Sequence, residues 1–266
     1  MNEKGIPKII HYCWFGGNKK SKLVRDCIST WVEKLPDYEI IEWNETNSDL
    51  SHSFVKEAYR LKKWAFVADY IRLEKVYKYG GIYLDTDMLL LKNFDDLLND
   101  DCFFGAEEPM LINAGIIGAM PKNTFIKECL LKYDTLEFNL NKNILDIIIP
   151  TIVTHTFIDF FGYSCDFNSI VIKNEVKIYP MCYFYPLPLK CKDDIINYTK
   201  YILPESYTVH LWVGSWVLYN EFEYLRKRNY TKGFRIVFKK IFLLEINYKY
   251  LRKVLSSVKE SLTKNK

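Results

Sequence analysis

The sequence predicts an α/β fold with a mainly parallel central sheet. Short apolar runs alternate with amphipathic stretches through the first half of the chain, which is typical of strands connected by helices. The hydrophobic content of 49% is that of a globular protein, and 266 residues allow one large domain or two small ones. We expect an α/β domain over residues 1–225 and a basic helical tail over 226–266.

Each predicted strand is a short apolar run bounded by turn residues. The first run ends at Gly16 and Gly17, and the third begins directly after a second glycine pair. The predicted strands, in chain order, are Ile6–Phe15, Tyr38–Trp43, Ile82–Leu91, Phe103–Glu107, Ala114–Ala119, Val176–Tyr179 and Thr208–Trp212.

Helices are predicted where apolar residues recur every three or four positions. The clearest is Trp64–Tyr79, which Gly80 or Gly81 can close by taking a left-handed conformation. We expect Asn139–Phe161 to be mixed and to be interrupted by Pro150. The other predicted helices are Ser21–Lys34, one that begins at Phe54–Tyr59, and Thr124–Tyr133.

Two aspartates stand inside the third predicted strand. Side chains two positions apart in a strand share a face, so Asp85 and Asp87 are expected to point at one object. Burying carboxylates is costly unless a cation or hydrogen-bond donors receive them. Hard oxygen ligands favour Mg²⁺ or Mn²⁺. The alternative is a solvated turn with two capping aspartates.

The helix before this strand carries Asp69 and Arg72, which are neighbours on one flank. Taken alone, they could form a surface ion pair of little energetic value. The whole segment from Ala65 to Met88, AFVADYIRLEKVYKYGGIYLDTDM, is more specific. It resembles the core signature of glycosyltransferase family 32, which is roughly (A/S)D-x-x-R followed by GG-x-Y-x-D-x-D. This family is related to yeast mannosyltransferases, bacterial capsule enzymes and large clostridial glucosylating toxins.

Three further blocks extend the resemblance over about residues 5–220. They read IPKIIHYCWFGG, NAGIIGAMPKN and VHLWVGSW. The middle, about 125–205, matches poorly, and acceptor specificity is expected there. The resemblance implies a GT-A type, Rossmann-like domain that binds a nucleotide sugar.

The resemblance also implies roles for individual residues. Asp87, Asp85 and His210 would hold Mn²⁺ or Mg²⁺, although a histidine near an apolar strand can also be a core residue. Asp69, Arg72 and Asp85 would form the catalytic group. The donor-binding residues would be Trp14, which would stack on the base or pack in the core, together with Asp69, Arg72, Asp85, Asn113, Ser215 and Trp216.

The implied activity is metal-dependent transfer of a hexose, with retention of anomeric configuration, from a UDP-linked donor to a glycan or lipid-linked oligosaccharide in surface polysaccharide synthesis. Two alternatives stay open. One is a glycoside hydrolase in which Asp85 and Asp87 act as acid and base. The other is a non-catalytic basic scaffold at a membrane.

The charge is distributed unevenly along the chain. Residues 226–266 contain 13 Lys or Arg and only two acids, which predicts a polyanionic partner. An anionic membrane surface is the leading hypothesis, helix packing on the core is the alternative, and nucleic acid is not expected. Seven cysteines without a CxxC pair, no signal-peptide pattern and no long apolar run favour a cytoplasmic protein, peripheral on the inner face of the membrane.

Overall fold

The computed structural model describes residues 5–139, 144–213, 221–226, 228–242 and 246–263. The chain divides into two compact units, Met1–Val213 and Gly214–Lys266. The predicted boundary after residue 225 lies within the second unit, because helix α7 (Glu221–Arg226) packs against α8 (Tyr230–Phe242) and α9 (Tyr248–Thr263). In the described part of the chain, no helix is long and apolar enough to cross a bilayer.

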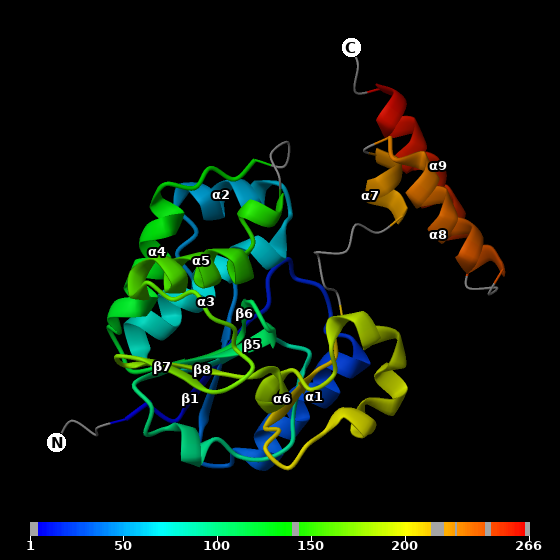
Figure 1. Ribbon diagram of the computed structural model, residues 1–266. Coiled ribbons are helices and arrows are strands. Elements are labelled where there is room, and N and C mark those ends of the chain that lie inside the picture. The colour runs from blue at the N-terminus through cyan, green and yellow to red at the C-terminus, as the bar shows by residue number, and fades with distance from the viewer. Residues whose placement is uncertain (1–4, 140–143, 214–220, 227, 243–245, 264–266) are drawn as a thin grey trace. The chain divides into compact units, whose positions relative to one another are not determined.

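The first unit is built on a seven-stranded sheet in the order β2-β1-β3-β6-β5-β8-β7 (Figure 1). The pairings give β2, β1, β3, β5 and β8 one direction and β6 and β7 the other, which confirms the α/β fold with a mainly parallel sheet. The strands are β1 (Ile9–Cys13), β2 (Glu39–Trp43), β3 (Gly81–Leu84), β5 (Cys102–Glu108), β6 (Leu111–Ala119), β7 (Val171–Lys173) and β8 (Val176–Tyr179).

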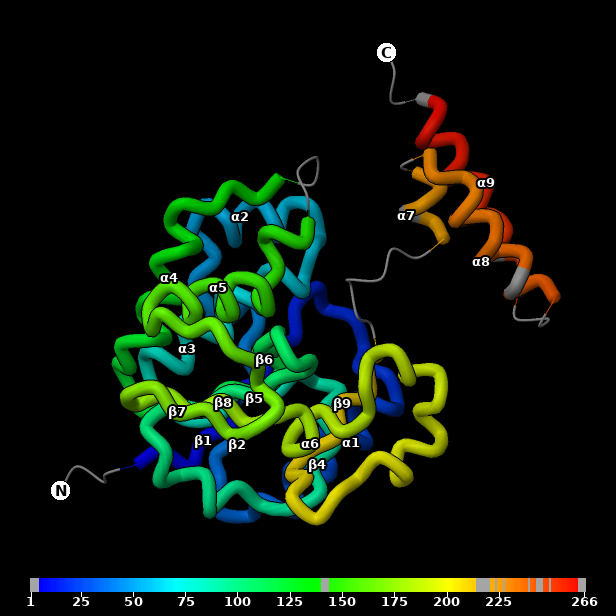
Figure 2. The backbone as a smooth tube through the Cα atoms, viewed as in Figure 1, coloured from blue at the N-terminus to red at the C-terminus, as the bar shows by residue number. Residues whose placement is uncertain are grey.

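The predicted strand Ile82–Leu91 is wrong as a single element. The chain leaves the large sheet after Leu84 and enters a separate two-stranded ribbon, in which β4 (Met88–Leu90) pairs antiparallel with β9 (Thr208–His210) (Figure 2). Asp85 and Asp87 lie in the turn between the sheets rather than on one face of a strand. A continuous apolar run cannot distinguish one buried strand from two that are separated by a turn.

Helices cover both faces of the large sheet. One face carries α3 (Trp64–Tyr79), α4 (Thr124–Asp134) and α5 (Ile149–Phe161), and the other carries α1 (Lys22–Lys34) and α6 (Met181–Phe184) (Figure 1). Pro150 does not interrupt its segment as expected, because it stands in the first turn of α5, where its missing N–H costs no helical hydrogen bond. The remaining elements are α2 (Ser53–Arg60) and the 3₁₀ segments η1 (Asp95–Leu97), η2 (Ile144–Asp146) and η3 (Leu189–Tyr201).

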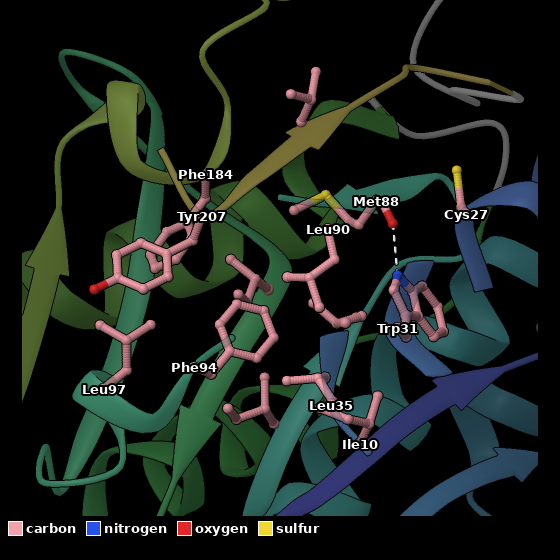
Figure 3. Close-up of a cluster of buried hydrophobic side chains, with 14 of the residues drawn as sticks. Ile10, Cys27, Trp31, Leu35, Met88, Leu90, Phe94, Leu97, Phe184 and Tyr207 are labelled. Atoms are coloured by element: carbon pink, nitrogen blue, oxygen red, sulfur yellow. Dashed lines mark hydrogen bonds between the residues drawn. The ribbon is translucent and has the colours of Figure 1, made fainter. Parts of the chain in front are cut away.

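The core on the α1 side fastens the β4–β9 ribbon to the sheet (Figure 3). Trp31 of α1 is fully buried, and its indole Nε1–H donates to the Met88 carbonyl at 2.7 Å. Ile10 of β1 and Leu90 of β4 belong to the same buried cluster. The ribbon that follows Asp87 is therefore held by apolar packing and by a specific hydrogen bond.

Candidate active site

The Asp85–Asp87 segment forms a tight turn at the carboxyl end of β3. Its backbone is fixed at both sides, since the Asp85 N–H donates to the Gly115 carbonyl at 2.8 Å and the Met88 N–H donates to the Asp85 carbonyl at 3.0 Å. Ligands of open α/β sheets bind at this end of the strands. The turn therefore holds both carboxylates at a position suited to ligand binding.

Arg72 joins the helix α3 to this turn. Its Nη2 lies 2.9 Å from Asp69 Oδ1, and its Nη1 lies 3.2 Å from Asp85 Oδ1. The same Nη1 donates to the Ala114 carbonyl at 2.7 Å, while the guanidinium carbon lies 4.5 Å from the centre of the Tyr83 ring. Nη1, Nη2 and one face of the guanidinium are therefore in contact with neighbours, which restricts where the cation can lie.

Asp69 and Asp85 differ in exposure although they share this arginine. Asp69 is fully buried, whereas the Asp85 side chain is 26% exposed. Burial raises the pKa of Asp69 to about 7, and the positive charge of Arg72 opposes this rise. Tyr83 donates its hydroxyl to Asp85 Oδ1 at 2.9 Å. Asp85 is thus the member of this group that is accessible to a ligand.

Asp87 is held by the last residue of β9 and by the segment that follows it. The His210 Nε2 lies 3.0 Å from Asp87 Oδ1, and the Val213 N–H donates to Asp87 Oδ2 at 2.7 Å. Trp212 makes the second contact possible by adopting a φ of 54°, which is uncommon for a residue other than glycine. Burial is the largest influence and disfavours a charged imidazole, but the hydrogen bond to Asp87 and the charges of Asp87, Asp85 and Glu107 together raise the pKa of His210.

Gly115 stands where several functional groups converge. A Cβ at this position would lie 3.0 Å from Asp85 Oδ2, 3.2 Å from the Tyr185 hydroxyl and 3.3 Å from Asn113 Oδ1. The Gly115 N–H donates to Asn113 Oδ1 at 2.7 Å, and the Asn113 amide donates to Glu107. Burial raises the pKa of Glu107, although the bond from Asn113 opposes this. The absence of a side chain at Gly115 is what allows these groups to approach.

Most of the predicted site residues come together, namely Asp69, Arg72, Asp85, Asp87, Asn113 and His210. Sequence reasoning missed Tyr83, Glu107 and Tyr185. Tyr83 and Glu107 lie inside the recognised blocks or next to them, but nothing in their local pattern indicates the contacts that they make. Tyr185 comes from the poorly matching middle of the chain, and its hydroxyl accepts from the Ile116 N–H at 3.0 Å.

The remaining predicted residues are placed differently. Trp14 follows β1, is half-buried against the core and donates from Nε1 to the Asn18 carbonyl at 2.7 Å. No contact tests its predicted stacking on a base. Ser215 and Trp216 lie outside the described residues. Beyond the end of β1 is a hollow of about 530 Å³, lined by Gly16, Gly17, Asn18, Glu45, Tyr59, Lys62 and Trp64.

Residues 21–104, which include the Asp85–Asp87 turn, match the family described as "Glycosyltransferase sugar-binding region containing DXD motif". The likeness to DXD glycosyltransferases thus extends over residues 21–104, about a third of the chain. The predicted family is thereby confirmed for the part of the chain that carries Asp69, Arg72, Asp85 and Asp87.

Two curated relatives have names that refer to ceramide lipids. The chain is 27% identical over 157 residues to inositol phosphoceramide mannosyltransferase 3 of Schizosaccharomyces pombe, which covers 55% of this chain and 42% of the relative. It is 26% identical over 195 residues to lactosylceramide 4-alpha-galactosyltransferase of Mus musculus, which covers 69% of this chain and 50% of the relative. The chain thus spans about half the length of the curated relatives that it matches.

Among solved structures, the chain is similar to the PaToxG glycosyltransferase, with 20% identity, a TM-score of 0.48, and coverage of 60% of this chain and 70% of that one. The chain is also similar to a glycosyltransferase involved in the glycosylation of the major capsid of PBCV-1, with 12% identity and a TM-score of 0.45. This match covers 77% of this chain and 94% of that one. The α/β assignment itself rests on the strand pairings given above.

The carboxylates of the DXD motif are chemically suited to a cation. Asp85 and Asp87 supply hard carboxylate oxygens of the kind that Mg²⁺ and Mn²⁺ prefer. Within the residues that the structure describes, no three or more His, Cys, Asp or Glu side chains form a group that could hold a metal ion. A cation bound by these two carboxylates would take its other ligands from elsewhere, such as phosphate or water. Direct coordination by His210 Nε2 would replace its hydrogen bond with Asp87.

Proposed function

We propose that this chain is a retaining glycosyltransferase that moves a hexose from a nucleotide sugar, with UDP as the expected nucleotide, to a glycan or lipid-linked acceptor. The observation that supports it most is the Asp69–Arg72–Asp85 chain of contacts beside the Asp87 turn, in a segment of the DXD glycosyltransferase family. The GT-A type of the domain is part of this proposal.

The donor sugar would lie against Asp85. Its hydroxyls can donate to the exposed part of the Asp85 carboxylate, which Arg72 and Tyr83 hold in one orientation. Asn113, whose Oδ1 lies near Gly115, would contact the same sugar or the acceptor. A nucleoside would extend from there, with Trp14 as its stacking partner and Ser215 and Trp216 at the diphosphate. These last three roles follow from the family resemblance.

Cleavage of the sugar–phosphate bond leaves additional negative charge on the nucleoside diphosphate. Mn²⁺ or Mg²⁺, when bound, would neutralise part of that charge. Asp87 and Asp85 would hold the cation, and His210 would contribute either as a ligand or by orienting Asp87 through its 3.0 Å contact. Arg72 would keep Asp85 in place during the reaction.

The relatives' names include ceramide lipids, which supports a lipid-bound acceptor in general, whereas the polysaccharide acceptor rests on the family resemblance. We propose a glycan or a lipid-linked oligosaccharide of a bacterial surface polysaccharide. A cytoplasmic enzyme that works at the inner membrane face would meet such an acceptor. The middle of the chain, which supplies Tyr185, would shape the acceptor side of the site.

The test is turnover of a panel of UDP- and GDP-sugars with Mn²⁺, with Mg²⁺ and with EDTA. Wild-type protein should release nucleoside diphosphate from one donor only when a metal is present, and Asp87→Ala should abolish this release. Asp134→Ala, which removes an exposed aspartate on α4, is the matched control and should act like the wild type.

Two other results would contradict the proposal and favour another function. Metal-independent cleavage of glycosides that depends on Asp85 and Asp87 would indicate a hydrolase. Failure to bind any nucleotide sugar with either metal would indicate a non-catalytic protein, for which the DXD motif is incidental.

A further inference from the structure

The C-terminal unit has its own small core. Helix α7 contributes Phe222 and Leu225, α8 contributes Val237 and α9 contributes Val254, and all four are buried. Polar contacts reinforce this packing. Arg226 Nε donates to Glu260 Oε2 at 2.8 Å, for example. Each of the three helices therefore uses one side for internal packing.

Helices α8 and α9 carry a second set of apolar side chains that this core does not use. Phe238 and Phe242 of α8 are 65% and 89% exposed, and Leu255 and Leu262 of α9 are 71% and 66% exposed. Helical spacing in the sequence places Leu255 and Leu262 near Val254. In the structure Val254 is buried in the small core, whereas Leu255 and Leu262 are exposed. Scattered exposed apolar residues are ordinary, whereas a row at helical spacing is not.

The exposed residues of α9 form a mixed stripe of apolar and basic side chains. Tyr248, Arg252, Leu255, Lys259 and Leu262 follow one another at intervals of four, three, four and three, which places them along one side of the helix. All five are exposed. The stripe thus offers apolar surface and positive charge together.

Helix α8 repeats this arrangement. Arg235 precedes Phe238 by three residues, and Phe242 follows Phe238 by four. At the end of the helix Ile241 is also exposed. We call these exposed apolar and basic residues of the two helices, together with Leu251, the basic-apolar surface, namely Arg235, Phe238, Ile241, Phe242, Tyr248, Leu251, Arg252, Leu255, Lys259 and Leu262.

We infer that the basic-apolar surface docks on an anionic lipid bilayer. Residues 226–266 carry 13 Lys or Arg against two acids, so the charge of the unit complements a negative membrane surface. Aromatic and leucine side chains placed beside arginines suit the boundary between headgroups and acyl chains. Phe242 at the end of α8 and Tyr248 at the start of α9 are 89% and 81% exposed, so each helix offers an aromatic side chain to the headgroup region.

The test is co-sedimentation of the full chain with vesicles of phosphatidylcholine alone and with phosphatidylglycerol mixed in. The wild type should bind only the anionic vesicles, and high salt should release it. Arg235→Gln with Arg252→Gln should weaken binding about fivefold for each charge removed. Phe238→Ser with Phe242→Ser should weaken it about tenfold or more.

Matched controls separate this surface from a general loss of charge or apolar area. Lys127→Gln with Lys190→Gln removes two exposed bases of the first unit, and Ile196→Ser removes an apolar side chain that is 88% exposed. Both control proteins should bind like the wild type. Circular dichroism should show that every variant keeps its helical content.

Three results would overturn the inference. The wild type could fail to bind anionic vesicles at low salt, which would favour packing of these helices on the rest of the chain. The controls could lose as much binding as the surface variants. Binding could also be equal on neutral vesicles and insensitive to salt. None of these readouts requires sugar transfer, so they are independent of the proposed activity.

Discussion

Arg72 lies between two carboxylates, with Nη2 2.9 Å from Asp69 Oδ1 and Nη1 3.2 Å from Asp85 Oδ1. One guanidinium thus connects the interior of α3 to the first aspartate of the DXD turn. The third contact, to the Ala114 carbonyl, adds strand β6 to the same centre. A planar fork can meet all three partners at once, whereas a lysine ammonium is a point charge.

Arg72→Lys should therefore lower the rate of transfer by about a hundredfold, because Asp85 loses its orientation. The measurement is nucleoside diphosphate release at saturating donor. Arg60→Lys is the control, since Arg60 pairs with Glu57 on the exposed side of α2. An Arg72→Lys enzyme with the wild-type rate would show that the fork does not position the site.

Gly115→Ala should reduce kcat by about tenfold or more while the protein remains folded. The added methyl would meet Asp85 Oδ2 at 3.0 Å, so the carboxylate must shift by a few tenths of an ångström. Gly162→Ala is the complementary control. Its Cβ meets nothing within 4 Å, but its φ of 58° is strained for alanine, so it should lower stability by about 1 kcal/mol and leave kcat unchanged. If both variants behaved alike, crowding at Gly115 would not be the cause.

Trp31→Phe should lower the free energy of unfolding by about 1–3 kcal/mol, because the buried Met88 carbonyl loses its donor. Urea unfolding measures this. Val32→Ala, at a neighbouring position on α1 that is 61% exposed, should change it by less than about 0.5 kcal/mol. An equal effect of the two substitutions would contradict the proposed anchoring of β4.

His11 should make stability depend on pH. Its Nε2 lies 2.7 Å from the Gly80 carbonyl, its Nδ1 accepts from the Trp43 indole at 3.1 Å, and burial lowers its pKa from 6.5 to about 4. Between pH 4 and pH 6.5 the unfolded chain protonates this histidine, whereas the folded protein keeps it neutral. The contribution of neutral His11 to the free energy of unfolding is therefore complete above pH 6.5 and is lost as the pH falls towards 4. This pH-dependent contribution to the free energy of unfolding amounts to at most about 3 kcal/mol.

The measurement is urea unfolding of the wild type and of His11→Gln from pH 4 to pH 7. The wild type should lose more stability than the variant over this range, and the difference between the two curves isolates His11 from other groups. Parallel curves would show that His11 is not held in the neutral form.

The sequence predicted much of this structure because most of the information was local. The helix at Trp64–Tyr79 and the strand at Val176–Tyr179 have the predicted bounds, since each has a clear period and a clear end signal. The break at Asp85 was missed because apolar residues lie on both sides of it. The antiparallel insertion of β6 next to β3 depends on pairing between distant segments, which no local pattern encodes.

In the candidate site, too, residues in a local motif were predicted and residues that come from distant segments were harder to predict. Asp69, Arg72, Asp85 and Asp87 were predicted because they stand in one continuous motif. Tyr185 was not predicted, because it is 69 residues away in the sequence from Ile116, whose N–H donates to its hydroxyl. The contact of His210 with Asp87 spans 123 residues, and only the family resemblance indicated His210.

The most direct test of the account is a crystal structure of the chain with UDP and Mn²⁺, measured at the manganese absorption edge. The account predicts an anomalous peak about 2 Å from a carboxylate oxygen of Asp87, in contact with the diphosphate. Bound nucleotide without manganese at Asp87, or manganese bound elsewhere in the chain, would contradict it.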